Sequence, residues 1–494
     1  MVDGVTITKA IILAGGDCTR MDQLVKGVHK SVLPVADVPN IVLLMKQLEA
    51  AGVRNFYISI FSNPDSIRVR VNDAMKAGMF HSDTRVRYRT ETRMMDTTSA
   101  AWSVYRRYSS NMLQWAMRGI MQEGVASFSD DEHVFVTACD MLLPGQDLRP
   151  FIKNYSYARQ RAKSWVSWKS EILGAIGFIV RPPSDFIDAH PSADIDSRGR
   201  ILKIDDEPPK SEEAAMDRYQ STLEHENLAR FQGATGMMGL PFPTFYFILS
   251  TKALRLMAKR LNIESRMTGR MNPRVDFMRD AFKALEGNLR AIFFEEPIVN
   301  GKLLRTYYDM NTPSDFFRAQ WMFLHSGIDL RWGYQKDIER GSWLAIGGVP
   351  KIHSGSTVRN CLIGRGVQIL PGCNISDSVI GEGCRIANAT IKGSVLMPYT
   401  HVNYYGGGRT GADIEYSIVG NGMRRGTLFD EVSLGITNIE EEGDEGEDGG
   451  DQRRHQRTLK LSKEMAIPGR GGMIKISGLP INGQEIALTS IPLF

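Results

Sequence analysis

The sequence lacks the features that mark secreted, zinc-bound and membrane-spanning proteins. Its five cysteines form no C-x-x-C pair and accompany no histidine cluster, which argues against a disulfide framework and a zinc site. No apolar run is long enough to cross a bilayer, and the first residues do not combine a basic segment with a long apolar stretch. We therefore expect a cytoplasmic protein with reduced thiols and no membrane partner.

A large charge of one sign is also missing. The formal net charge is +4 over 494 residues, and lysine and arginine are interspersed with acids. This balance argues against nucleic acid as a partner. An apolar fraction of 42% over this length is ordinary for globular protein and predicts two or three domains, with room for a large core.

The most informative segment begins with the apolar run Ala10–Leu13, which is typical of a strand buried in a parallel sheet. Gly15 and Gly16 follow it, and glycine permits a close approach of the backbone to a ligand. Backbone N–H groups in such a turn can point at anionic oxygens, and Arg20 and Lys30 add positive charge nearby. A glycine pair alone usually only reverses the chain, but these cations at their offsets favour a polyphosphate site.

This segment resembles the signature of the sugar-nucleotide pyrophosphorylases, written G-G-x-G-T-R and later K-P. The resemblance implies that the backbone from Leu13 and Ala14 through the two glycines binds substrate, and that the arginine and lysine act in catalysis. Two positions depart from the pattern: Cys18 replaces a turn glycine, and Ser31 replaces the proline after the lysine. If the turn needs a positive φ at position 18, cysteine is strained there.

Alternating strand and helix patterns follow the turn. We expect a helix over Ile41–Leu48, a strand over Asn55–Ile60, a helix over 100–118 and a strand over His133–Ala138. This order predicts an α/β fold with a mostly parallel, doubly wound sheet. Ligands bind at the carboxyl ends of strands in such sheets, where the glycine turn and Asp140 both fall.

Two acids match the metal-binding aspartates of the family, and the resemblance implies that they hold Mg²⁺. Asp140 closes the strand at 133–138, and Asp309 lies in a segment that resembles aromatic-x-D-x-G-T-P, with Asn311 in place of the glycine. A single aspartate after a strand is more often a helix cap. Mg²⁺ needs only one or two carboxylates beside phosphate oxygens and water, so two are enough.

Two further segments resemble substrate-binding motifs less closely. Thr97 lies in a turn like the family's G-T-A-D-A, with Asp96 in place of glycine, although an ordinary helix cap is an equal alternative. The residues from Asp194 to Ile204 predict a turn feeding a strand, which leads into a segment like F-x-E-K-P. There Asp206 stands for the glutamate that binds substrate, and Glu207 replaces the lysine that grips the sugar phosphate.

Isoleucine or valine recurs every five or six residues after position 350, separated by glycine and small polar residues. This period predicts a left-handed parallel β-helix, in which one apolar residue per short strand points inward. Such a domain is more often structural or oligomerising than catalytic. The recurring positions are Ile352, Val358, Ile363, Ile369, Ile375, Ile380, Ile386 and Ile391.

These patterns predict a nucleotidyltransferase domain over 1–330, a β-helix over 331–425, a charged linker over 426–463 and a short β segment over 464–494. The acidic run 440–451 cannot bury apolar area and should be solvated. The basic block 453–457 screens these acids or contacts an anionic partner.

Within the family, the segment around Asp309 and the β-helix look most like glucose-1-phosphate adenylyltransferase. The resemblance implies ATP and a sugar-1-phosphate as substrates, Mg²⁺ as cofactor, chemistry that serves glycogen biosynthesis, and a homo- or hetero-oligomer. One alternative is a catalytically weak regulatory or scaffold subunit, such as the gamma subunit of a translation initiation-factor exchange complex. Another is an assembly protein in which the nucleotidyltransferase domain is a passenger.

Overall fold

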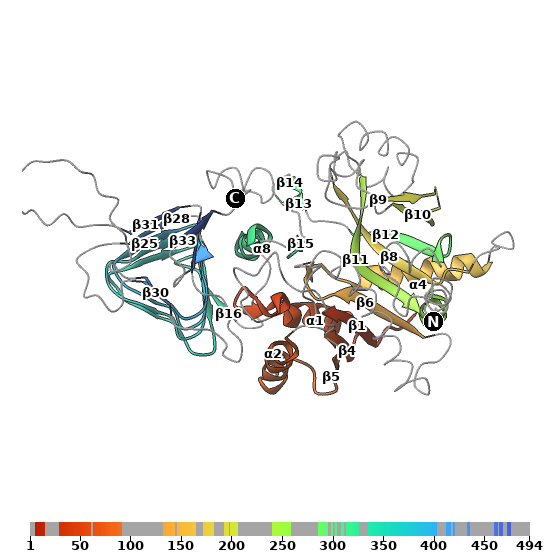
Figure 1. The fold of residues 1–494 in the computed structure, drawn as a ribbon, viewed down its shortest axis with the longest axis horizontal. Helices are drawn as coiled ribbons and strands as arrows, with labels where there is room; N and C mark the ends of the chain where they lie inside the picture. The colour runs from red at the N-terminus through yellow and green to blue at the C-terminus, as the bar shows by residue number, and fades with distance from the viewer. Residues whose placement is uncertain are drawn as a thin grey trace, which may run out of the picture. The chain divides into compact units, whose positions relative to one another are not determined.

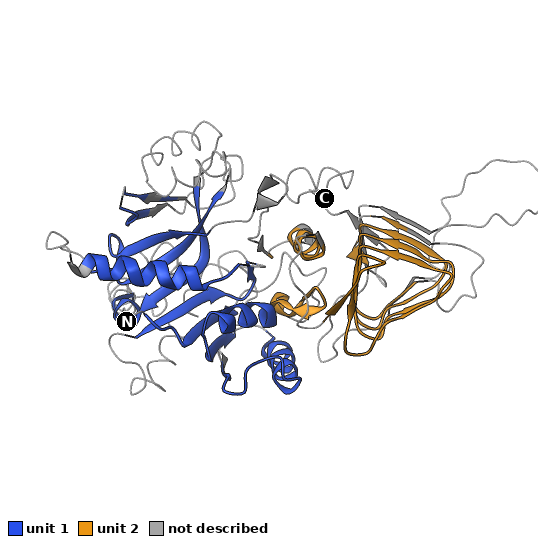
Figure 2. Ribbon diagram, turned by 180° about the vertical axis from the view of Figure 1, so that it is seen from behind, with its two compact units in different colours: residues 1–17, 41–309 blue, residues 18–40, 310–494 orange. Residues whose placement is uncertain are grey.

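A computed structural model describes most of the predicted core. It covers residues 5–14, 29–60, 63–90, 132–143, 146–164, 171–181, 192–196, 198–205, 240–257, 285–294, 298–299, 302–303, 308–310, 313–325, 334–402, 412–415, 418–419, 432–434, 459–462, 464–467 and 472–475. The chain divides into two compact units, which we call unit 1 (residues 1–17 and 41–309) and unit 2 (residues 18–40 and 310–494) (Figure 2).

Unit 1 is built on a seven-stranded sheet in the order β12-β8-β11-β6-β1-β4-β5 (Figure 1). Strand β11 runs antiparallel to both of its neighbours, and every other neighbouring pair is parallel. The fold is therefore α/β with a parallel-dominated sheet, and one strand makes the sheet mixed. The strands are β1 (Lys9–Ala14), β4 (Asn55–Ile60), β5 (Arg85–Thr90), β6 (His133–Ala138), β8 (Gly174–Arg181), β11 (Leu240–Ser250) and β12 (Leu289–Phe293).

The predicted elements at the start of this sheet are confirmed. Helix α1 (Asn40–Ala50) covers the expected 41–48, and β4 and β6 have the predicted bounds. The helix expected over 100–118 lies outside the described residues. The remaining elements are α2 (Pro64–Lys76), α4 (Arg149–Ser164), β7 (Met141–Leu142), β9 (Ser192–Ile195), β10 (Ile201–Asp205), β13 (Ile298–Val299), β14 (Lys302–Leu303) and β15 (Tyr308–Asp309).

The core of unit 1 lies between the sheet and its surrounding elements. Ile11 and Val136 of the central strands are fully buried, as are Ile176 of β8 and Phe247 of β11. These side chains belong to one apolar cluster that also contains residues of the β9 and β10 hairpin. Burial of this apolar surface holds β1 and β6 rigidly together, and these strands carry the residues of the candidate site.

The described part of unit 2 starts with a short buried segment, and a helix follows much later in the chain. Its first elements are a 3-10 helix (Lys30–Val32), the hairpin strands β2 (Pro34–Val35) and β3 (Val38–Pro39), and α8 (Pro313–His325). A coil of short strands follows: β16 (Tyr334–Asp337), β17 (Ser342–Ala345), β18 (Lys351–Ile352), β19 (Thr357–Arg359), β20 (Leu362–Ile363), β21 (Gln368–Ile369), β22 (Asn374–Ser376), β23 (Val379–Ile380), β24 (Arg385–Ile386), β25 (Ala389–Lys392), β26 (Val395–Leu396) and β27 (Thr400–Val402).

From β17 to β29 (Ile418–Val419), each strand of the coil pairs in parallel with the third strand after it, which creates three stacked sheets (Figure 2). The first strand, β16, instead pairs antiparallel with β17. Ile363 pairs with Ile380, and Ile369 pairs with Ile386, so one turn advances the chain by 17 residues. Three strands separated by five or six residues give a turn of this length, which explains the period in the sequence. Sheets of this kind suggest the β-helix that the period predicts.

The sheets continue through strands near the end of the chain. β30 joins β27, β31 joins β28, and β32 joins β29. The pairing includes residues 432–434, 459–462 and 464–467, in the part of the chain that we assigned from sequence to a charged linker and a short β segment. The strands are β28 (Ala412–Glu415), β29 (Ile418–Val419), β30 (Val432–Leu434), β31 (Leu459–Ser462), β32 (Glu464–Ile467) and β33 (Gly472–Lys475).

The recurring isoleucines form the interior of the coil. Ile352 is partly buried against this core, and the other recurring positions are at most 2% exposed. The four described cysteines are buried and none forms a disulfide. Burial raises the pKa of Cys361 and of Cys384 to about 12, so both remain thiols near neutral pH.

The alternation of strand β25 predicts unequal effects from two neighbouring substitutions. Ile391 is fully buried, whereas Thr390 is exposed. We expect Ile391→Ala to destabilise the coil by about 2–5 kcal/mol through lost burial and a cavity. Thr390→Ala should stay within about 0.5 kcal/mol of the wild type. Denaturant unfolding of both full-length variants measures the difference, and equal effects would contradict the inward assignment of Ile391.

Candidate functional site

The candidate site lies at the carboxyl ends of β1 and β6 in unit 1. From β1 the chain proceeds to β4 and β5 on one side of the sheet, and then to β6 on the other side of β1. The strand order therefore reverses between β1 and β6. Open α/β sheets bind ligands outside the carboxyl ends of the strands at such a switch point (Figure 1).

Leu13 and Ala14 occupy the end of β1, and both are buried. Leu13 lies opposite Ala138 in the parallel pairing of β1 with β6. The Cys139 N–H then donates to the Leu13 carbonyl at 3.0 Å, which continues the pairing one residue beyond β6. This hydrogen bond fixes the backbone immediately before Asp140, whose side chain is 9% exposed.

The second aspartate reaches the same place through a separate pair of short strands. β15 runs antiparallel to β7, with Asp309 opposite Met141 and Tyr308 opposite Leu142. Asp309 therefore lies across from the residue that directly follows Asp140. Antiparallel neighbours are about 5 Å apart at Cα, so the pairing brings the backbones of the two predicted metal ligands together.

Gln47 of α1 supports the loop that follows Asp140. Its side-chain amide donates to the carbonyls of Leu143 at 2.5 Å and Gln146 at 3.0 Å, and its oxygen accepts from the Tyr246 hydroxyl at 3.0 Å. Sequence reasoning missed this residue. The helix also contains Asn40, Lys46 and Glu49, so the sequence did not distinguish Gln47 from these polar residues or identify its partners.

Lys30 belongs to unit 2 and lies in the 3-10 helix, where it is 6% exposed. His29 caps this helix, because its Nδ1 accepts from the Ser31 N–H at 3.2 Å and lies 2.8 Å from the Ser31 hydroxyl. The departure at position 31 therefore has a local role. Proline has no N–H and could not make the bond to His29.

Several predicted site residues lie outside the described residues. They are Gly15, Gly16, Arg20, Thr97 and Asp206, together with the departures Cys18, Asp96, Glu207 and Asn311. The predicted turn before residue 201 is present: Asp196 accepts from the N–H groups of Arg198 at 3.0 Å and Arg200 at 2.8 Å. It joins β9 to β10, which leads toward Asp206.

The donors at positions 140 and 309 fit Mg²⁺ in their chemistry. Both residues carry carboxylates, which are the hard oxygen ligands that this ion prefers. Within the part of the chain that the structure describes, no group of three or more His, Cys, Asp or Glu side chains could hold a metal ion. One or two carboxylates together with phosphate oxygens and water are enough to hold this ion.

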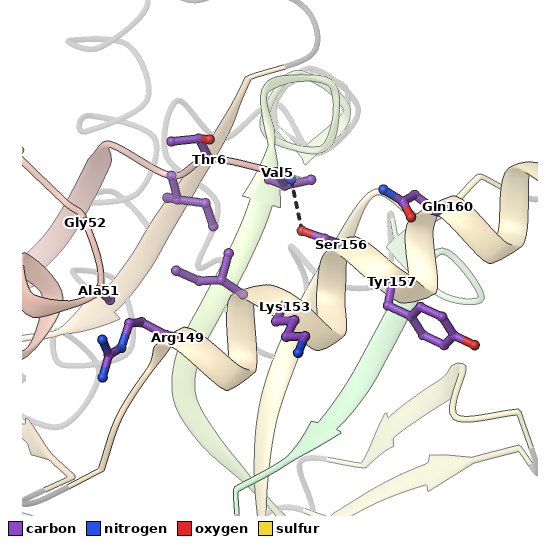
Figure 3. Close-up of a pocket in the computed structure, with 11 residues that line it drawn as sticks. Val5, Thr6, Ala51, Gly52, Arg149, Lys153, Ser156, Tyr157 and Gln160 are labelled. Carbon is purple, nitrogen blue, oxygen red and sulfur yellow. Dashed lines mark hydrogen bonds between the residues drawn. The ribbon is translucent and has the colours of Figure 1, made fainter. Parts of the chain in front are cut away.

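A separate pocket of about 540 Å³ lies at the opposite end of β1 (Figure 3). Val5, Thr6 and Ile7 precede β1 on one side, and α4 contributes Lys153 and Ser156 on the other. The Val5 N–H donates to the Ser156 hydroxyl at 3.0 Å. Because β1 separates the two places by about 20 Å of extended chain, this pocket is not part of the candidate site.

A comparison with protein-family models matches part of the chain. Residues 10–200 match the family model of the MobA-like NTP transferase domain, and no curated protein matches the chain. The match supports a nucleotidyltransferase family. It covers Leu13, Ala14, Lys30 and Asp140, but it does not reach Asp309 or the coil. It does not distinguish glucose-1-phosphate adenylyltransferase from other nucleotidyltransferases. Among the helices described here, none is both long and apolar enough to cross a membrane.

The contacts of Gln47 predict that it stabilises the loop after Asp140. In Gln47→Leu the two carbonyls and the Tyr246 hydroxyl lose their partner, which should cost about 1–3 kcal/mol of unfolding free energy. We also expect faster amide exchange over residues 140–146. Tyr246→Phe is the comparison variant: it removes the hydroxyl's bond to Gln47 and its hydrogen bond with the Leu143 backbone but leaves both bonds from Gln47 to the loop carbonyls, so it should speed exchange less. If both variants exchange at the same rate over this loop, the assignment of Gln47 is wrong.

Proposed function

We propose that this protein transfers a nucleotidyl group from a nucleoside triphosphate to a sugar-1-phosphate and releases pyrophosphate. The observation that carries the proposal is the meeting of β1, Asp140 and the backbone of Asp309 at the switch point of the sheet. The NTP transferase match over 10–200 supports the same class of chemistry independently.

In the proposed reaction, a phosphate oxygen of the sugar-1-phosphate attacks the α-phosphorus of the triphosphate. A bond forms between that oxygen and the phosphorus, the bond from the phosphorus to the bridging oxygen breaks, and pyrophosphate leaves with the electron pair. Such transfers depend on positioning and on positive charge around the phosphates. Arg20 and Lys30 would stabilise the charge that develops on the leaving group.

The two aspartates would hold Mg²⁺, which neutralises phosphate charge when it is bound. Backbone N–H groups from Leu13 to Gly16 would bind the triphosphate. Thr97 would contact the nucleotide, and Asp206 the sugar phosphate. ATP and glucose-1-phosphate are the substrates that the resemblance to glucose-1-phosphate adenylyltransferase favours.

One observation favours a second candidate, a catalytically weak regulatory or scaffold subunit. Glu207 stands where a lysine would grip the sugar phosphate. Two like charges in a desolvated site repel by roughly a few kcal/mol, which would oppose binding of a sugar-1-phosphate. A subunit of this kind would bind nucleotide and turn over slowly.

We also propose that the coil is a left-handed β-helix that serves assembly into a homo- or hetero-oligomer in the cytoplasm. The parallel sheets and the inward isoleucines support the β-helix. We place the boundary between the nucleotidyltransferase domain and the β-helix near residue 330.

Substitution of the proposed metal ligand and cation tests the reaction. We expect Asp140→Asn and Arg20→Ala to lower pyrophosphate release by about 100-fold or more, because each change removes charge that stabilises the transition state. The exposed Asp73 of α2 provides a matched control, and Asp73→Asn should keep wild-type turnover.

The assay should screen several sugar phosphates and triphosphates on the purified chain. Wild-type turnover in either site variant would overturn the assigned roles. No turnover by the wild type, together with retained nucleotide binding, would favour the regulatory subunit instead.

A further inference from the structure

The hairpin that follows Lys30 has an unfavourable backbone conformation. Its turn residues Ala36 and Asp37 have φ values of 48° and 61°. Residues with a Cβ rarely adopt this left-handed region, and two in succession persist only where surrounding contacts hold them. The hairpin lies close to the lysine in the chain, since β2 begins at Pro34.

Two side chains of unit 2 hold the turn from outside the hairpin. Gln320 of α8 accepts from the Ala36 N–H at 2.9 Å, and its amide donates to the Pro34 carbonyl. The Tyr334 hydroxyl donates to the Ala36 carbonyl at 3.1 Å. Gln320 and Tyr334 are at most 3% exposed, so these bonds are protected from competition with water.

The coil holds Asp37 directly. The Glu382 N–H, between β23 and β24, donates to the Asp37 carboxylate at 3.1 Å. The other carboxylate oxygen lies against Gly364, where an added Cβ would stand 2.7 Å from it. Only glycine, which has no Cβ, leaves room for the Asp37 carboxylate at position 364. We call the contacts of Asp37 with Tyr334, Gly364 and Glu382 the Asp37 seat.

Several ionisable groups face Asp37 in this seat. Burial, together with the Glu382 carboxylate, raises the pKa of Asp37 to about 7, although residue 37 as a whole is partly exposed. Hydrogen bonds from the Glu382 and Arg365 backbones and the Arg365 charge oppose this rise in the pKa. Arg365 also pairs with Glu382 at 3.1 Å, and the Tyr334 hydroxyl and the Cys384 thiol complete the surroundings.

A continuous set of hydrogen bonds connects the seat to Lys30. The Val32 N–H donates to the His29 carbonyl, and the Leu33 N–H donates to the Lys30 carbonyl, both at 3.1 Å. The Asn40 N–H closes the hairpin on the Leu33 carbonyl at 3.0 Å. Hydrogen bonds therefore connect the backbone from His29 to Asn40 into one segment, which we call the braced segment. The coil holds this segment at Asp37.

We propose that the Asp37 seat positions Lys30, so that the coil is part of the phosphate-binding machinery as well as a platform for assembly. This inference rests on the role assigned to Lys30 in the proposed function. Asp37 is a positioning residue here, because it acts through the braced segment and not on the substrate.

Two variants disturb the seat in different ways. Gly364→Ala places a methyl group against the Asp37 carboxylate and within 2.7 Å of the Glu382 backbone nitrogen, which should displace the hairpin. Gly347→Ala is its matched control, because that methyl group meets only the Arg365 side chain at an ordinary 3.7 Å. Asp37→Asn keeps the size of the side chain and an oxygen that can accept from the Glu382 N–H, but it removes the carboxyl group that titrates.

We expect Gly364→Ala to speed amide exchange over residues 30–40 at least tenfold and to lower kcat/KM for the triphosphate by a similar factor. The Gly347→Ala control should have the same exchange rate and the same kcat/KM as the wild type. Equal exchange over this segment in the two glycine variants would overturn the inference, whatever the activity. If the wild type shows no turnover, the proposed function is rejected. If Gly364→Ala nevertheless speeds exchange over residues 30–40, the role of the Asp37 seat in holding this segment is still supported.

The pH dependence gives a test that remains if Gly364→Ala fails to fold. An acid with a raised pKa favours the folded state when protonated, so its stabilising contribution is full below its unfolded pKa near 4 and is lost as the pH rises through about 7. Ionisation also places a second negative charge beside Glu382. We expect intrinsic-rate-corrected exchange over residues 30–40 to rise between about pH 4 and about pH 7 in the wild type and to level off above that, and this step to vanish in Asp37→Asn. A step that persists in Asp37→Asn would refute the role of Asp37.

Discussion

The parallel pairing of β1 with β6 is the constraint on which the candidate site depends. It is closed by the hydrogen bond from the Cys139 N–H to the Leu13 carbonyl, just beyond the last paired residues. Because both strands are buried, neither can shift along the other without exposing apolar side chains or breaking buried hydrogen bonds. The end of β1 and the residue before Asp140 are consequently fixed to each other by the core itself.

The second aspartate depends on a weaker arrangement. β15 and β7 are two residues long each, so their pairing contributes few hydrogen bonds of its own. Its position follows from the rigid end of β6, which β7 continues, and from Gln47, which holds the loop on the far side of β7. The backbone at Asp140 is therefore positioned by two long buried strands. The backbone at Asp309 is positioned only through its pairing with β7 and the residues that hold β7.

The elements that sequence could predict are those with a strong local signal. The apolar runs of β1, β4 and β6 and the helical spacing of Ile41 and Leu48 depend only on neighbouring residues, and all were predicted. The coil was predictable for a similar reason, because a turn of 17 residues repeats the same inward isoleucine. Local patterns do not encode partners that are distant in sequence. The antiparallel direction of β11, the pairing of β15 with β7 and the three bonds of Gln47 could not be predicted for that reason.

The same distinction applies to two residues near Lys30, the departure Ser31 and the turn residue Asp37. Ser31 looks like a loss when it is compared with a proline, yet its N–H and hydroxyl both contact His29, and the pair forms a capped 3-10 helix. Asp37 looks like an ordinary turn residue, yet its carboxyl group lies in a space that Gly364 leaves open more than 300 residues later in the chain. In both places polar contacts hold the backbone near Lys30. A motif comparison judges each position by residue type alone, whereas the backbone near the lysine also depends on partners that lie far away in the chain.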